Sequence, residues 1–442
     1  MSNTTQNADK NEVFTQAQLD GLAALHQRFL QGRLGGKRAV LRHVDLTGLS
    51  LAGKDMRQAD FTSVIMRTMD LTGTSFQEGT LYSCDLSYAT LNRASFLRAD
   101  LRGSRIEGAD LQRTDLKDAD LREGGVMDAS GNGGISTVNF RGANLTGARL
   151  SGCLANRADF SDAILAKAHL GHADFRGAVM EGADLTGAEI EGIQLSGAKL
   201  NHAILTGVDL SHIRDREMGV DLTRAITSEN VGRSIVDLDE PLVKMIDRHR
   251  LWLSTAGLEG ARLDITDIDM RELGTLKQQK LAALRGNNSN FFGMNLYKIE
   301  LQSSILHEAD FRRCDLEEAD FRGSDLQDAR FNHANLKGAN FGTLMFSAES
   351  TQKFAACNLN GAVFRYADLK GSRFKNAQLH DADFSYCDLR NADFTGADLR
   401  GAIFDKANTE GAIFTGAKRE GTEKGRAFSL AALKALDSGD EA

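Results

Sequence analysis

The sequence predicts an all-β fold in which short extended sides wind into stacked coils, as two arrays in tandem with short α-helical caps. A bulky apolar residue recurs at every fifth position over most of the chain. Pro occurs once, against 44 Gly, which suits a continuous ladder of backbone hydrogen bonds because Pro has no N–H to donate. Two similar amphipathic segments each precede a stretch of repeats.

Composition and charge limit the classes of protein to which this chain can belong. The chain has 442 residues, of which 41% are hydrophobic and 26% charged, which is typical of a globular protein. Its net charge of -8 predicts no general attraction to nucleic acid or anionic lipid. We expect a flexible, polar N-terminus over residues 1–14, no signal peptide and no run of roughly 18 apolar residues that could span a membrane. These features predict a cytoplasmic protein that binds neither nucleic acid nor membrane directly.

The repeat has the form A-(D/N)-(L/F)-x-G. In the first array its bulky residues are Leu46, Leu51, Met56, Phe61, Met66, Leu71, Phe76, Leu81, Leu86, Leu91, Phe96, Leu101, Ile106, Leu111, Leu116 and Leu121. The small and the bulky residue are two positions apart, so an extended side directs both to one face. The Asp or Asn between them then faces water or caps the turn. One unit cannot bury a core alone, so coils must stack at roughly 4.7–4.9 Å, the spacing of neighbouring strands.

This pattern resembles the pentapeptide-repeat family over most of the chain. The resemblance implies a right-handed quadrilateral β-helix, in which four pentapeptides make one square coil. An alternation in the second half supports an even number of sides independently. It runs through Phe311, Leu316, Phe321, Leu326, Phe331, Leu336 and Phe341, and again from Phe364 to Phe404. On a four-sided coil, this ten-residue period predicts ladders of Phe on two opposite walls.

Breaks in the repeat divide the chain. We expect a helical cap and first array over 15–210 with a Gly-rich loop near 127–137, and a connector over 211–240. A second cap and array follow over 241–420, with a slip in the repeat at 347–353. Residues 421–442 form a C-terminal amphipathic helix and tail, serving as a cap or as a homodimer contact. The loop, the slip and a short helix near 275–285 are the segments where a partner would bind, because loops on a rigid frame usually carry recognition.

The two cap helices are predicted from their start signals and matching apolar positions. Thr15 and Gln18 form a capping-box pattern, and Asp239 as N-cap with Pro241 opens the second helix. Thr275 and Gln278 predict the short third helix. The two caps match at six pairs of positions: Leu19 and Leu242, Leu22 and Met245, Ala23 and Ile246, His26 and His249, Phe29 and Trp252, Leu30 and Leu253. We expect these caps to cover the open ends of the stacks.

No residue is assigned a catalytic, cofactor-binding or metal-binding role. The five cysteines occupy the small, inward position of the repeat and are interpreted as buried apolar residues: Cys84, Cys153, Cys314, Cys357 and Cys387. His26 and His249 are interpreted as packing or hydrogen-bonding residues. His172 and His212 would lie two coils apart, too far to share a metal. A filled tube offers no cleft for acid–base chemistry, so we expect no enzyme activity.

Two functions remain open. The first is a non-catalytic scaffold that presents rigid walls and projecting loops to a protein partner. The alternative, implied by the family resemblance, is a DNA mimic that binds DNA gyrase or topoisomerase and protects it from inhibitors. Mild net charge and outward basic residues argue against mimicry, since they interrupt an acidic stripe: Arg102, Arg122, Arg141, Arg176, Arg312, Arg322 and Arg400.

Overall fold

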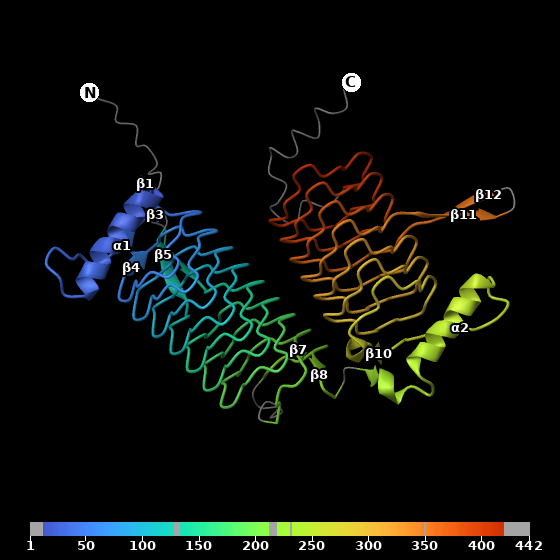
Figure 1. Ribbon diagram of the computed structural model, residues 1–442, viewed down its shortest axis with the longest axis horizontal. Helices are drawn as coiled ribbons and strands as arrows, with labels where there is room; N and C mark the ends of the chain where they lie inside the picture. The colour runs from blue at the N-terminus through green and yellow to red at the C-terminus, as the bar shows by residue number, and fades with distance from the viewer. Residues whose placement is uncertain (1–11, 128–132, 212–218, 230–231, 349–350, 420–442) are drawn as a thin grey trace, which may run out of the picture. The chain divides into compact units, whose positions relative to one another are not determined.

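A computed structural model describes residues 12–127, 133–211, 219–229, 232–348 and 351–419 (Figure 1). The chain divides into two compact units, Met1–Asn230 and Val231–Ala442. In each unit a helix, α1 or α2, precedes a stack of coils in the chain (Figure 1). The hydrophobic core of each unit runs along the interior of its stack.

The coils are held together by parallel pairing between residues one turn of the chain apart. Asp60 pairs with Thr80, and Asp320 with Asn340, so one coil takes 20 residues. Hydrogen bonds between coils follow this pairing, and the Leu71 N–H, for example, donates to the Thr90 carbonyl at 2.8 Å. Most pairs are isolated bridges, and the longer ones form the parallel pairs β2 (Val40–Arg42) with β4 (Asp60–Thr62) and β7 (Ile204–Leu205) with β8 (Ile226–Thr227).

The inward assignment of the bulky residues is confirmed. Leu111, Phe175 and Phe384 are all fully buried. In the second unit the phenylalanines form two stacks, whose rings lie face to face with centroids 4.8–5.1 Å apart. Rings from different stacks meet edge to face, as Phe331 and Phe341 do at 5.8 Å. The Phe ladders predicted from the ten-residue alternation are therefore present.

Most sides of the coils end in a turn with left-handed backbone. The residue two after the bulky centre has a positive φ, for example 64° at Gly73 and 57° at Lys167. A side chain in this region is strained by roughly 1–2 kcal/mol because its Cβ approaches the following carbonyl oxygen. The frequent Gly of the repeat has no Cβ and removes that strain.

The first unit begins with β1 (Glu12–Val13), which pairs in parallel with β3 (Val44–Asp45). The prediction of a flexible segment over 1–14 is therefore wrong for its last three residues, since the Phe14 N–H also donates to the Asp45 carbonyl at 3.1 Å. Helix α1 (Gln16–Leu30) follows, and the predicted capping box of Thr15 and Gln18 is present. These residues cover the edge of the first coil and leave fewer of its backbone groups open.

The second unit repeats this order. Strand β9 (Arg233–Ser234) pairs in parallel with β10 (Ile268–Asp269), and α2 (Leu242–Ser254) follows a short 3-10 helix, Ile235–Asp237. The prediction of Asp239 as N-cap is wrong. Helix α2 starts after Pro241, which takes the N-cap position without a side-chain hydrogen bond, because Pro sets the φ of the residue that enters the helix.

Two further expectations need correction. The connector over 211–240 is too long, because Asp221 pairs with Lys199 and β8 pairs with β7, extending the first stack. Residues 275–285 form no α-helix. They continue the coil through bridges from Thr275 to Asn295 and Lys280 to Glu300, after a 3-10 helix at Arg271–Leu273. Leucines that lie five and three positions apart can line either the interior of a coil or one face of a helix. Hydrogen bonds to the next coil decide in favour of the coil.

Both breaks in the repeat are antiparallel hairpins. Strands β5 (Gly124–Met127) and β6 (Gly133–Ser136) pair where the 127–137 loop was predicted, and β11 (Leu344–Ala348) pairs with β12 (Thr351–Ala355) at the predicted slip. The β11–β12 hairpin projects from the second stack (Figure 1). The C-terminal helix predicted over 421–442 lies outside the described residues.

Candidate interaction surface

The cysteines lie in the core, as interpreted from the repeat. All five are free and buried. Burial raises the pKa of the Cys84 thiol to about 12, because a thiolate in an apolar interior is poorly solvated. The thiols of Cys314 and Cys387 each donate to a backbone carbonyl, of Phe291 and Phe364, at 2.9 Å. These groups are inert packing residues, since reactive cysteines need a lowered pKa and access.

His26 and His249 hold the cap helices to the stacks, which confirms their hydrogen-bonding interpretation. The Ala39 N–H donates to His26 Nδ1, and the Leu263 N–H donates to His249 Nδ1, both at 3.0 Å. Both imidazoles are buried, and desolvation lowers the pKa of each. His26 Nε2 lies 3.0 Å from the Arg57 carbonyl, so the neutral ring carries its proton on Nε2.

The outer walls carry paired charges. The Asp of a repeat often accepts a hydrogen bond from the backbone N–H two residues on. Where an Arg stands at that position, the two side chains also pair, as those of Asp100 and Arg102 do at 2.7 Å. The same i, i+2 pair occurs at Asp55–Arg57, Asp120–Arg122, Asp174–Arg176, Asp269–Arg271, Asp310–Arg312, Asp320–Arg322, Asp388–Arg390 and Asp398–Arg400. The walls therefore mix both signs.

The pair of Asp310 and Arg312 differs from the others. Arg312 was expected to face outward, yet its side chain is only 4% exposed and that of Asp310 only 9%. Arg312 donates from Nη2 to Asp310 Oδ2 at 2.6 Å and from Nε to Oδ1 at 2.9 Å. Burial raises the pKa of Asp310, but the charge and hydrogen bonds of Arg312 outweigh burial and lower that pKa. This forked geometry stabilises the pair away from water.

The β11–β12 hairpin exposes apolar side chains. Met345 and Phe354 are directly paired across its two strands, so both point to one face. Their side chains are 64% and 61% exposed, and Phe346 is 42% exposed. The β5–β6 hairpin exposes Ile135, and Gly125 at its base donates its N–H to the Tyr82 hydroxyl at 2.6 Å.

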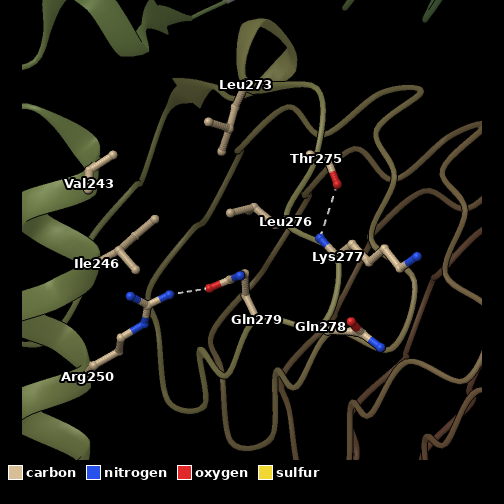
Figure 2. A pocket seen from close by; sticks show the side chains of 9 residues that line it. All are labelled: Val243, Ile246, Arg250, Leu273, Thr275, Leu276, Lys277, Gln278 and Gln279. Atoms are coloured by element: carbon tan, nitrogen blue, oxygen red, sulfur yellow. Dashed lines mark hydrogen bonds between the residues drawn. The ribbon is translucent and has the colours of Figure 1, made fainter.

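A pocket of about 390 Å³ lies between α2 and the first coil of the second unit. Figure 2 shows Val243, Ile246 and Arg250 on the helix side and the coil residues on the other. Arg250 hydrogen-bonds the Gln279 side chain, and the Lys277 N–H donates to the Thr275 hydroxyl at 3.2 Å. The full lining is Val243, Ile246, Arg250, Leu273, Thr275, Leu276, Lys277, Gln278 and Gln279.

In the described part of the chain, no three His, Cys, Asp or Glu side chains gather as a metal ion would need. His212 lies outside that part, so the expected separation of His172 and His212 stays a prediction. Among the same residues, no helix is both long and apolar enough to cross a bilayer.

Sequence reasoning missed Gln16, Met345 and Phe354. The Gln16 side chain bonds Ser50, 34 residues away, and no local pattern signals such a contact. Met345 and Phe354 did leave a signal, because apolar residues in a segment that has lost the repeat have no place in the core.

The repeat profile described as "Pentapeptide repeats" matches the chain in eight copies. They cover residues 39–77, 81–122, 136–171, 156–192, 180–214, 304–342, 357–396 and 392–423. A search of the curated proteins gives no match.

Solved structures of similar proteins include HetL, a pentapeptide repeat protein involved in heterocyst differentiation regulation from the cyanobacterium Nostoc sp. strain PCC 7120. It is 19% identical, with 88% of this chain and 95% of HetL covered and a TM-score of 0.14. Trypsin-treated QnrB1, a plasmid-mediated fluoroquinolone resistance protein, is 20% identical over 50% of this chain and 99% of its own, with a TM-score of 0.23. Rfr23 from the cyanobacterium Cyanothece 51142 is 22% identical over 29% of this chain and 86% of its own, with a TM-score of 0.15.

The eight matches cover more than half of the 442 residues. Family members fold as right-handed β-helices, which agrees with the ladder of parallel bridges in both units. The chain therefore belongs to the pentapeptide-repeat family.

Proposed function

We propose that the chain is a non-catalytic scaffold that binds a protein partner through its projecting β11–β12 hairpin. The observation that carries this proposal is the exposed pair of Met345 and Phe354 on one face of the hairpin. Apolar side chains on a projecting element gain free energy when a partner buries them, at about 25 cal/mol per Å². The stack behind the hairpin supplies a rigid base, because each coil is bonded to both neighbours.

The arrangement of the walls belongs to the same proposal. We infer that each 20-residue coil is four-sided and that the two units are tandem arrays, each with its own cap. Equivalent elements support this, since β1 and β9, and α1 and α2, occur in the same order. Free, buried cysteines fit a cytoplasmic location. Homodimerisation through residues 421–442 remains a proposal from the sequence.

DNA mimicry is the weaker hypothesis. A mimic of the phosphate backbone needs an unbroken row of negative charge. On these walls, Asp and Arg alternate as close pairs, for example Asp120 with Arg122 at 2.7 Å. Binding to DNA gyrase or topoisomerase is therefore an outcome for the experiment to detect.

A pull-down from a lysate of the native host tests the scaffold, with the full chain as bait. The double variant Met345→Ser/Phe354→Ser removes the exposed pair. Val236→Ser is the matched control, because Val236 is also exposed in the second unit. We expect a partner that is captured by the wild type and the control but lost with the double variant. Equal capture by all three baits would refute the role of the hairpin, and inhibition in a gyrase supercoiling assay would favour mimicry.

A further inference from the structure

The two caps cover the first coil of their stacks in nearly the same way. In the first unit, His26 accepts from the Ala39 N–H, and β1 pairs with β3. In the second, His249 accepts from the Leu263 N–H, and β9 pairs with β10. The first coil of each stack has backbone groups that no preceding coil can pair with. At two places these groups are therefore covered in the same way in both units.

At a third place on the edge of the first coil, a cap side chain bonds the open backbone groups only in the first unit. The side-chain amide of Gln16 bonds the backbone of Ser50 twice, donating to its carbonyl and accepting from its N–H, both at 2.9 Å. Thr275 holds the equivalent place in the second unit. Its N–H donates to the Leu273 carbonyl at 2.8 Å, and its own carbonyl has no hydrogen-bond partner among the described residues.

The difference arises from where the helices begin. His26 lies seven residues after Leu19, and His249 lies seven residues after Leu242, so these positions correspond. Helix α1 starts three residues before Leu19, whereas α2 starts at Leu242. The turn that carries Gln16 is therefore missing from α2, and the pocket of Figure 2 opens in its place beside Thr275.

The lining of this pocket selects the group that would fill it. Thr275 is solvent-exposed, so water can reach its carbonyl, and a group that displaces this water must supply an N–H donor in its place. Arg250 and Lys277 line the pocket and no carboxylate does, which disfavours an ammonium or guanidinium donor. A neutral carboxamide satisfies both conditions. Val243, Ile246 and Leu276 supply apolar walls for its methylene groups.

We propose that this pocket binds a glutamine side chain of a partner polypeptide, with an acidic residue nearby to face Arg250, which in the structure pairs with Asp247 at 2.8 Å. The amide nitrogen donates to the Thr275 carbonyl, as Gln16 donates to Ser50 in the first unit. This site is separate from the β11–β12 hairpin, so either proposal can fail without the other.

Fluorescence anisotropy with the full chain tests the site. The probe is a fluorescein-labelled peptide that copies residues 14–20, FTQAQLD, which contains Gln16 and Asp20. Two further peptides carry Gln16→Leu and Gln16→Glu. We expect saturable binding of the first peptide and affinity about tenfold weaker for the other two, because Leu cannot donate and Glu places a carboxylate against a carbonyl.

Pocket variants locate the binding. Val243→Trp fills the pocket, and Arg250→Glu reverses its charge. Leu258→Trp is the matched control, since Val243 and Leu258 are 65% and 89% exposed and only Val243 lines the pocket. Circular dichroism melts check that each variant folds. We expect about tenfold weaker binding with the two pocket variants and none of this loss with the control. The proposal is overturned if no peptide binds saturably, if the Leu peptide binds equally, or if Leu258→Trp weakens binding as much as Val243→Trp.

Discussion

Replacing Phe341 by Ala tests the stacked-ring core of the second unit. Phe341 is fully buried and has four ring partners. It stacks on Phe321 and Phe374, with centroids 5.0 and 4.9 Å away, and meets Phe331 and Phe364 edge to face at 5.8 and 5.9 Å. The change removes all four contacts and leaves a cavity inside one coil.

The magnitude follows from these contacts. A buried Phe→Ala change costs about 3–5 kcal/mol, and each ring pair contributes about 0.5–1.5 kcal/mol beyond burial. Phe291 is the matched control, because it is also buried but stacks on Phe311 alone among the described rings. Three fewer ring contacts predict that Phe291→Ala is less destabilising by about 1.5 kcal/mol or more.

Urea unfolding followed by tryptophan fluorescence measures the difference, since Trp252 is the single Trp and lies in α2. We expect the lower midpoint for Phe341→Ala, although Phe291 belongs to a coil nearer the α2 end of the stack. An equal or larger loss for Phe291→Ala would refute the ring-contact reasoning and favour distance from the cap as the cause.

Three other perturbations separate the remaining interactions. Arg312→Ala removes the guanidinium that pairs with the buried Asp310 carboxylate and should cost about 3–5 kcal/mol in chemical denaturation; a loss under 1 kcal/mol would contradict this. Desolvation lowers the His26 pKa in the folded protein. Below about pH 6.5, the ordinary pKa of His, the unfolded chain therefore binds more protons than the folded chain. The stability that the neutral His26 side chain contributes should therefore be fully present above that pH and decline as pH falls toward the lowered pKa. The free energy of unfolding of His26→Leu should depend less on pH. Lys167→Gly relieves a φ of 57° and should raise the melting temperature, by about 0.5–1 kcal/mol in stability, whereas Lys117→Gly, outside that conformation, should lower it.

The five-residue period predicted which side chains face the coil interior, because in extended backbone the direction of a side chain depends on local spacing alone. Any residue at the centre of a repeat, such as Leu111 or Phe384, faces inward once the sides are extended. The equivalence of His26 and His249 could likewise be predicted, since both lie at one position of similar helices. The sequence also indicated where the wall is interrupted, because Gly-rich and apolar residues replace the repeat there.

Tertiary structure decided what the period leaves ambiguous. Residues 275–285 carry leucines that suit either a helix face or a coil, and the Leu276 N–H joins the ladder by donating to the Asn295 carbonyl at 3.0 Å. The pairing of Met345 with Phe354 required the register of the hairpin. The bonds from Gln16 to Ser50, and the open carbonyl of Thr275, depend on where each helix begins over its stack. Spacing along the chain specifies which side chains are buried, but only folding brings distant backbone groups within hydrogen-bonding range of one another.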